Sequence, residues 1–207
     1  MSDFNDKQIQ ILQVAEELFS DKGFDGTSIR EIAKKANINI AMVSYYFGSK
    51  EKLLEALIIF RTSDLKMQLE NLYIEELAPM EKVEKLIDLY IKRLNQNRHM
   101  YKILHFEFSS NKRIIDFKVF TDMKKQNLLS LKKIINEGQD QGVFSKDVNI
   151  ALLPPTIMGP FFHFQMNRNY YEEIFNFQSE EDFDNYIKTD LTNHIKKTIK
   201  ALLVYEN

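Results

Sequence analysis

The stretch that decides the fold is "GFDGTSIREIAKKANINIAMVSYYFGSKEKLL", residues 23–54. Within it, apolar residues recur at helical spacing in two short segments, 28–36 and 40–47. A three-residue turn, 37–39, separates these segments. Two short helices joined by a tight turn predict a helix-turn-helix, whose second helix lies in the major groove of DNA.

Capping residues mark the ends of these helices. Ser28 and Glu31 have the spacing of a capping box at the start of the first helix. The side-chain oxygen of Asn39 is placed to accept a hydrogen bond from the first turn of the second helix. Gly48 ends that helix, and Ser49 caps another that begins immediately afterwards. The short helices are therefore bounded on both sides by residues suited to helix ends.

The flanking sequence is helical as well. An apolar stripe over residues 11–19 predicts a first helix that stops at Gly23. The helix that starts at Ser49 meets no Gly or Pro before Pro79, which predicts one long fourth helix. Helical periods continue to the end of the chain. The sequence thus predicts an all-α fold, in which an N-terminal three-helix helix-turn-helix domain is joined by a long fourth helix to a larger helical domain.

Composition places the chain among ordinary globular proteins. It has 207 residues, 44% hydrophobic and 28% charged, which disfavours wholesale disorder. The absence of cysteine excludes disulfides and thiolate metal sites. The first ten residues lack the features of a signal peptide, and the most apolar run, 150–164, is interrupted by prolines and shorter than the ~20 residues of a membrane span. These features predict a cytoplasmic protein with no membrane segment.

The sequence lacks the patterns on which catalysis usually depends. It has no cysteine nucleophile, no GxSxG, no Gly-rich phosphate loop and no pair of histidines at i, i+4. Its acidic residues are spread along the helices, as solvated charge usually is. We therefore expect no enzyme activity, no cofactor and no metal site.

The outward face of the second short helix is suited to DNA. Val43 and Phe47 lie four residues apart and are expected to pack inward on the preceding helices. The opposite side holds small and nearly uncharged residues that can approach base edges closely: Ile40, Ala41, Ser44 and Tyr45.

Over roughly the first 60 residues the chain resembles the tetracycline-repressor (TetR/AcrR) family. The resemblance lies in the Gly-Phe turn, the Thr-Ser start of the second helix, "IREIA", the Tyr-Phe end of the third helix and the Ser-Lys start of the fourth. It implies a ligand-responsive transcriptional repressor with a DNA-binding domain over residues 1–48 and an effector-binding, dimerisation domain over 49–207. A homodimer would bind a palindromic operator in double-stranded DNA and be released by a small-molecule effector.

The resemblance also implies roles for individual residues. Five match positions that contact the sugar-phosphate backbone in the family: Thr27, Ser28, Tyr45, Tyr46 and Lys50. Five others would read bases, with Arg30 as an outlying candidate for a guanine edge or a phosphate: Ile40, Ala41, Met42, Ser44 and Arg30. Either tyrosine of the pair is alternatively a core residue.

Two features depart from many members of this family. Ser44 is the one obvious hydrogen-bonding base reader of the third helix, so part of the specificity is expected to come from DNA shape. Residues 1–52 hold seven Lys and Arg against eight Asp and Glu, which predicts a modest salt dependence per subunit. The alternative is a helical interaction or ligand-binding module whose helix-turn-helix is degenerate and no longer binds DNA.

The C-terminal domain offers candidate dimer and ligand residues. The segment near 150–167 is apolar on more than one face, and the last helix has an apolar stripe, which together predict a four-helix dimer seam. Its predicted residues are Leu153, Ile157, Phe161, Phe164, Ile187, Leu191, Ile195 and Leu202. Predicted pocket residues, which are alternatively core, are His105, Phe106, Phe108, Met158, Phe162 and His163. The aromatic segment 168–179 has no assigned role.

Overall fold

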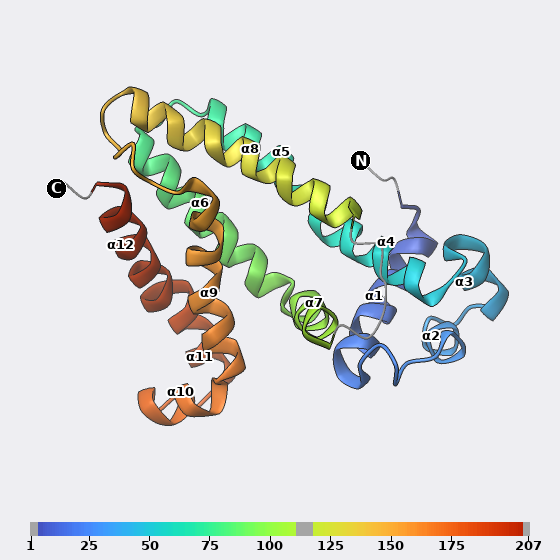
Figure 1. The fold of residues 1–207 in the computed structure, drawn as a ribbon. Helices are drawn as coiled ribbons and strands as arrows, with labels where there is room; N and C mark the ends of the chain where they lie inside the picture. The colour runs from blue at the N-terminus through green and yellow to red at the C-terminus, as the bar shows by residue number, and fades with distance from the viewer. Residues whose placement is uncertain (1–3, 111–117, 205–207) are drawn as a thin grey trace. The chain divides into compact units, whose positions relative to one another are not determined.

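The computed structural model describes residues 4–110 and 118–204, and every regular element in these ranges is helical (Figure 1). The all-α class predicted from the sequence is confirmed. Among the described residues, no helix is both long enough and apolar enough to cross a membrane. The elements are α1 (Asp6–Lys22), α2 (Ile29–Lys35), α3 (Ile40–Phe47), α4 (Lys50–Thr62), α5 (Leu65–Ile74), α6 (Pro79–Gln96), α7 (Arg98–Ser110), α8 (Lys118–Asp140), the 3-10 turn η1 (Ile150–Leu152), α9 (Leu153–Met166), α10 (Arg168–Phe175), α11 (Glu180–Tyr186), the π-helical segment η2 (Ile187–Leu191) and α12 (Thr192–Leu203).

The chain forms two compact units. The first comprises Met1–Leu65 and Asn97–Lys125, and the second comprises Lys66–Gln96 and Gln126–Asn207. The first unit therefore contains not only the three helices of the predicted DNA-binding domain but also α4, α7 and the start of α8. The predicted boundary at residue 48 lies inside this unit.

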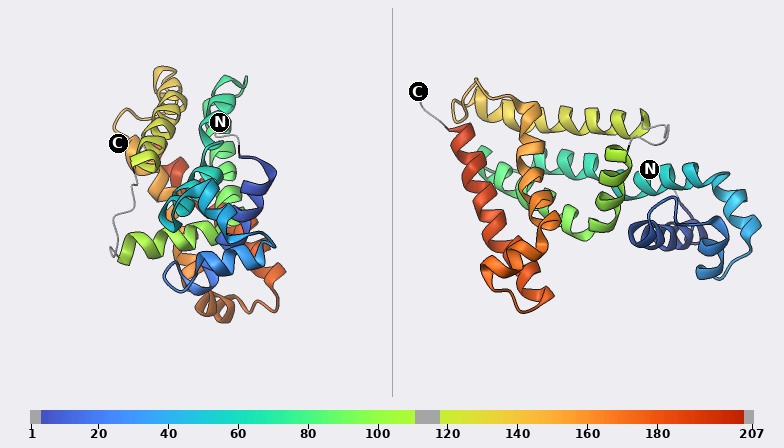
Figure 2. Two further views of the ribbon diagram at one scale, coloured as in Figure 1. Left: turned by 90° about the vertical axis from the view of Figure 1, so that its right-hand side faces the viewer. Right: turned by 60° about the horizontal axis from the view of Figure 1, so that its bottom comes forward.

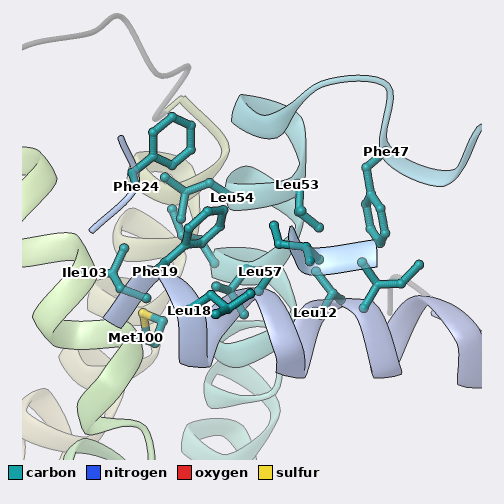
Figure 3. Close-up of a cluster of buried hydrophobic side chains, with 14 of the residues drawn as sticks. Leu12, Leu18, Phe19, Phe24, Phe47, Leu53, Leu54, Leu57, Met100 and Ile103 are labelled. Atoms are coloured by element: carbon teal, nitrogen blue, oxygen red, sulfur yellow. The ribbon is translucent and has the colours of Figure 1, made fainter. Parts of the chain in front are cut away.

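The core of the first unit explains why it extends past residue 48. Apolar side chains from α1, α2 and α3 pack on Leu53, Leu54 and Leu57 of α4 and on Met100 and Ile103 of α7 (Figure 3). A three-helix unit of about 45 residues buries too little apolar surface to be stable by itself in most cases. The side chains of α4 and α7 complete the missing part of the core.

The predicted long fourth helix is broken. It ends at Thr62 and α5 begins at Leu65. The Thr62 hydroxyl donates to the Ile58 carbonyl across 2.6 Å, and short polar side chains follow at Ser63 and Asp64. Such side chains compete with the backbone for hydrogen bonds and favour helix ends over helix interiors. The prediction of a continuous helix up to Pro79 was therefore wrong.

The second unit is built around α6. This helix packs on both α9 and α12, which also pack on each other (Figure 2, right). Ile87 of α6, Ile157 of α9 and Ile195 of α12 are at most 1% exposed. A buried ammonium, that of Lys82 on α6, pairs with Glu137 of α8 at 2.8 Å. Three helices thus share one apolar core, and an ion pair ties α8 to α6.

The aromatic segment without a predicted role forms α10 and part of an aromatic cluster. Phe164 of α9 stacks on Tyr171, Phe183 and Tyr186, with ring centroids 4.4, 4.8 and 5.2 Å apart. Asn176, in the left-handed conformation with φ of 54°, ends α10. Stacked rings therefore hold α10 and α11 against the end of α9.

Candidate nucleic-acid interface

The outward face of α3 is formed as the sequence predicts. The Asn39 side chain accepts from the Ala41 amide across 2.9 Å, and Gly48, with φ of 78°, ends the helix. Val43 and Phe47 are buried on its inner side. On the other side Ile40, Ala41 and Ser44 are exposed, and Met42 is half-buried at the edge. The helix therefore presents a small, uncharged surface to solvent.

The two adjacent tyrosines of α3 have different environments. Tyr45 is 84% exposed, whereas Tyr46 is half-buried and packs against the core of the first unit. Their ring centroids are 5.3 Å apart and the rings meet edge to face. An aromatic side chain as exposed as Tyr45 contributes little to the core, so its phenol is free to meet a partner. Tyr46 combines a core contact with partial exposure.

The two residues before α2 differ in what they can offer to a phosphate. Ser28 is exposed and caps α2 by accepting from the Glu31 amide across 3.1 Å. Thr27 is only 2% exposed, and its hydroxyl is directed at the carbonyls of Leu18 and Gly23 at 3.1 and 2.8 Å. The predicted phosphate contact of the Thr27 hydroxyl is therefore corrected, because this group fixes the turn from inside the fold.

The Lys50 ammonium is held by the turn between α1 and α2. It donates to the carbonyls of Phe24 and Thr27, each at 2.8 Å, and lies 4.3 Å from the centre of the Phe24 ring. The side chain is half-buried rather than extended into solvent. Sequence reasoning placed Lys50 at this surface but missed Phe24, because no sequence pattern reveals a contact between positions 26 residues apart.

Much of the positive charge near α2 is neutralised inside the fold. Lys22 pairs with Glu31, and Lys35 pairs with Glu17 at 2.5 Å. The hydrogen bond from Lys22 lowers the pKa of Glu31 below its ordinary value. Both pairs join α2 to α1, so these lysines are already engaged before any DNA is bound.

Arg30 and Lys34 lie one turn apart on the other side of α2. Both are exposed, and in the described part of the chain neither forms an ion pair. A cation without an acidic partner can approach a phosphate without first breaking an ion pair. The structure therefore keeps Arg30 as a candidate DNA contact and adds Lys34, which the sequence did not single out.

The predicted pocket residues fall into both compact units. His105 and Phe106 belong to the first unit and are exposed on α7, and the side chain of Phe108 lies outside the described residues. In the second unit Met158 and Phe162 are half-buried on α9. His163 is exposed, with its Nδ1 3.0 Å from the Tyr171 hydroxyl. A shared pocket of these residues stays a prediction.

The predicted dimer seam is corrected by the burial of its residues. Seven of them are at most 8% exposed within a single chain, so they have almost no surface left to bury against a second chain. They form the core of the second unit instead: Leu153, Ile157, Phe161, Phe164, Ile187, Leu191 and Ile195. The eighth, Leu202, is 48% exposed. Helical period identified an apolar face but not whether that face packs inside the chain.

The helix-turn-helix with its exposed uncharged α3 face, attached to a second helical unit, defines a DNA-binding transcriptional regulator of the two-domain type. Two family models match the chain: "Bacterial regulatory proteins, tetR family" over residues 11–57 and "Tetracyclin repressor-like, C-terminal domain" over 79–186. The chain belongs to the tetR family, a class of ligand-responsive regulators. The predicted family is confirmed, and the likeness extends well beyond the first 60 residues.

Curated relatives and solved structures agree with this assignment. The probable HTH-type transcriptional regulator YttP of Bacillus subtilis is 31% identical over 134 residues, which is 64% of this chain and 64% of that protein. The alignment thus covers slightly less than two thirds of YttP. The HTH-type transcriptional repressor NicS of Pseudomonas putida is 30% identical over 68% of this chain and 67% of its own. The regulator FadR of Bacillus subtilis, solved in complex with stearoyl-CoA, is 19% identical, with a TM-score of 0.73 over 93% of this chain and 97% of that one.

Proposed function

We propose that this regulator is a repressor that binds a palindromic operator as a homodimer and leaves it when a small-molecule effector binds. The observation that supports this most directly is the outward face of α3, where Tyr45 is 84% exposed and Ile40 is 45% exposed. Apolar and aromatic side chains left in water on a recognition helix indicate a surface that is covered in the functional state. A regulator of this kind acts in the cytoplasm, where its DNA is.

Base reading is assigned to the first five residues of α3, Ile40 to Ser44. Among these residues Ser44 supplies the side-chain hydrogen-bonding group, and Ile40, Ala41 and Met42 offer apolar contact to thymine methyl groups. Replacing Ser44 with Ala should change the preferred base at one pair of each half-site and leave binding to random DNA unchanged. Selection of bound sequences from a random DNA pool, with the wild type and with the Ser44→Ala variant, measures the base preference of each. An unchanged preference would remove Ser44 from the reading residues.

Backbone contacts are assigned to residues around this face. Five residues of the first unit carry exposed or half-buried hydrogen-bond donors: Ser28, Arg30, Tyr45, Tyr46 and Lys50. Removing a phosphate contact weakens binding to all DNA sequences about equally. Each charged contact that is removed lowers the salt slope by about one. Arg30→Met should therefore act on specific and random duplexes alike, whereas an effect on one sequence alone would indicate a base contact.

The homodimer interface is assigned to an exposed stripe of α9 instead of the predicted seam. We define the α9 stripe as Leu152, Pro155, Gly159, His163 and Met166, all exposed at helical spacing. Residues 153–166 contain no Asp, Glu, Lys or Arg, although a solvent-facing helix normally carries charge on its outer face. Gly159 would place an added Cβ in open space, so a neighbouring helix can approach its backbone closely. A second copy of the chain is the partner that covers this face.

The adjoining side of α12 extends this interface. We define the α12 flank as His194, Thr198, Ala201 and Leu202, which are exposed and include no Lys, Arg, Asp or Glu. On another side of the same helix, Lys196 pairs with Asp88 of α6 at 2.7 Å. Together, the α9 stripe and the α12 flank give each subunit two uncharged helix faces, which supports a four-helix interface of two chains.

A charge placed in the α9 stripe tests the interface. Gly159→Glu improves helix propensity but brings a carboxylate to the proposed contact, so it should convert the dimer into a monomer in sedimentation experiments. Asn193→Glu, at an exposed position of α12 outside the flank, is the matched control and should leave the dimer intact. A dimeric Gly159→Glu protein would rule out this interface.

An acyl-CoA is the effector class that we propose first. The support is the shared fold with FadR, whose structure contains stearoyl-CoA, and the half-buried apolar residues Met158 and Phe162 on α9. To move the regulator from ~99:1 bound to ~1:99, the effector must prefer the non-binding state by about 10⁴-fold. Stearoyl-CoA should raise the Tm and weaken DNA binding, whereas coenzyme A alone should do neither. No change in either measurement would exclude this class.

A further inference from the structure

We propose that Phe24 is a positioning residue for DNA binding, because its ring and carbonyl hold the Lys50 ammonium ready for a phosphate. The proposal rests on the assignment of Lys50 as a backbone contact in the proposed function. Three groups surround the ammonium on the protein side: the Phe24 carbonyl, the Thr27 carbonyl and the face of the Phe24 ring. Phe24 contributes two of the three.

The cradle is made of atoms that cannot move easily. Phe24 is only 3% exposed and its ring lies 5.2 Å from the ring of Phe19. The Thr27 amide donates to the Phe24 carbonyl across 3.2 Å, and the Thr27 hydroxyl is directed at the Leu18 and Gly23 carbonyls. Contacts inside the fold that do not involve Lys50 therefore hold the turn between α1 and α2 in place.

Lys50 itself is delivered to the cradle by the start of α4. Ser49 caps this helix by accepting from the Lys52 amide across 3.2 Å, which makes Lys50 its first residue. A lysine ammonium has three N–H donors, and the two carbonyls at 2.8 Å engage two of them. One donor of a half-buried side chain remains for a partner in solvent.

The groups that hold Lys50 carry no net charge. Two other lysines of this unit are paired with carboxylates, Lys52 with Glu55 and Lys35 with Glu17. In the described part of the chain no carboxylate forms an ion pair with Lys50. Carbonyl dipoles and an aromatic face attract a cation without cancelling its charge. A phosphate thus has no carboxylate to displace from Lys50, and the long side chain is already held in place, so that binding a phosphate need not immobilise it further.

A double-mutant cycle tests the proposal. The probe is a duplex of about 30 base pairs of random sequence, long enough for two half-sites about one helical turn apart. Lys50→Met should lower the affinity about tenfold and the salt slope by about one per subunit. Phe24→Leu should lower the affinity about threefold with an unchanged slope, because the charge and both backbone carbonyls remain and only the ring face is lost. In the Lys50→Met background, Phe24→Leu should have no further effect.

Met100→Ala is the control, since it removes a buried side chain of the same core, on α7, without touching the Lys50 ammonium or the Phe24 ring. It should leave DNA binding unchanged at temperatures where the protein is folded. A second measurement needs no variant: the side-chain ¹⁵N resonance of the Lys50 ammonium should be observable in the free protein, because its two hydrogen bonds slow exchange with water.

These measurements distinguish a failure of the positioning role of Phe24 from a failure of the backbone contact of Lys50. If Phe24→Leu weakens binding equally with and without Lys50, or if the Lys50 ammonium is as mobile as that of an exposed lysine, Phe24 is a core residue only. If instead Lys50→Met changes neither affinity nor slope, the backbone contact of Lys50 is itself wrong. If Lys50→Met lowers the affinity and Phe24→Leu has no further effect in that background, the backbone contact of Lys50 and the positioning role of Phe24 are both supported.

Discussion

Arg61 of α4 donates from Nε to Oε2 of Glu16 on α1 across 2.9 Å, and the Glu16 side chain is only 7% exposed. A carboxylate so far from water is stable when it is paired, and removing its partner leaves an uncompensated charge. This pair joins α1 to α4 within the first unit.

Arg61→Ala should therefore lower the free energy of unfolding by about 2 kcal/mol, less than the ~3–5 kcal/mol of a fully buried pair because Arg61 is 28% exposed. Urea denaturation measures the change. Lys52→Ala, which breaks the exposed pair with Glu55, is the control and should cost less than about 0.5 kcal/mol. Equal losses from both variants would show that the burial of Glu16 has no energetic consequence.

The turn of the helix-turn-helix depends on Asn37. This residue has φ of 52°, and the next residue, Ile38, donates its amide to the Ala33 carbonyl across 3.0 Å. Glycine adopts this conformation without strain, whereas a β-branched side chain does not. Asn37→Gly should change stability by less than about 0.5 kcal/mol, and Asn37→Val should destabilise by ~1–2 kcal/mol. Thermal unfolding of the two variants measures the difference in stability. An Asn37→Val protein as stable as the Asn37→Gly protein would contradict the dependence of the turn on residue 37.

The adjacent tyrosines of α3 should separate DNA binding from folding. Tyr45→Ala removes a side chain that is 84% exposed, so stability should change by less than about 0.5 kcal/mol. DNA affinity should fall about tenfold, the value of one hydrogen bond to a charged group at ~1.5 kcal/mol. Tyr46→Ala should cost ~1–2 kcal/mol of stability, because its half-buried ring packs on the core. Unfolding and DNA-binding titrations of each variant measure its stability and its affinity. Equal losses of stability and of affinity in the two variants would refute different roles for Tyr45 and Tyr46.

Stability in alkali should depend on Tyr186. Burial in the aromatic cluster, followed by the charges of Asp190 and Tyr171, raises the pKa of Tyr186 above its ordinary value. A phenol with a raised folded-state pKa stabilises the fold fully below its unfolded pKa of about 10, and this contribution is lost as the pH rises through the folded value. The Tyr186→Phe variant should lose less stability than the wild type on the same rise in pH.

Ultraviolet difference absorbance of the tyrosines measures the titration itself. Asp190→Asn should lower the pKa of Tyr186 but leave it above its ordinary value, because burial is the larger cause. A pKa of Tyr186 at or below that of a free tyrosine would contradict this account.

The helix-turn-helix was predictable because its determinants are local. The helix over 40–47 begins and ends in the structure where Asn39 and Gly48 place it. Caps and turns depend on side chains within a few residues of the backbone groups that they satisfy, so a single sequence reveals them. Even the break after α4 had a local signal in Thr62, Ser63 and Asp64, which outweighed the absence of Gly and Pro.

The C-terminal sites were less predictable because they depend on distant contacts. The period of α9 identifies Ile157 and Phe161 as apolar, but not whether they face α6 or a second chain. The better guide to an outer contact is exposed sequence without charge, as around Gly159. The contact of Lys50 with Phe24 likewise joins residues 26 positions apart and needs the folded chain to be seen.

In the proposed function the exposed face of α3 reads DNA as part of a dimer. Selection of bound sequences from a random double-stranded pool, with purified protein at low and at physiological salt, tests it most directly. We predict enrichment of an inverted repeat whose half-sites are separated by about one helical turn. A folded dimer that enriches no sequence at either salt would contradict the claim, and would favour a module whose helix-turn-helix no longer binds DNA.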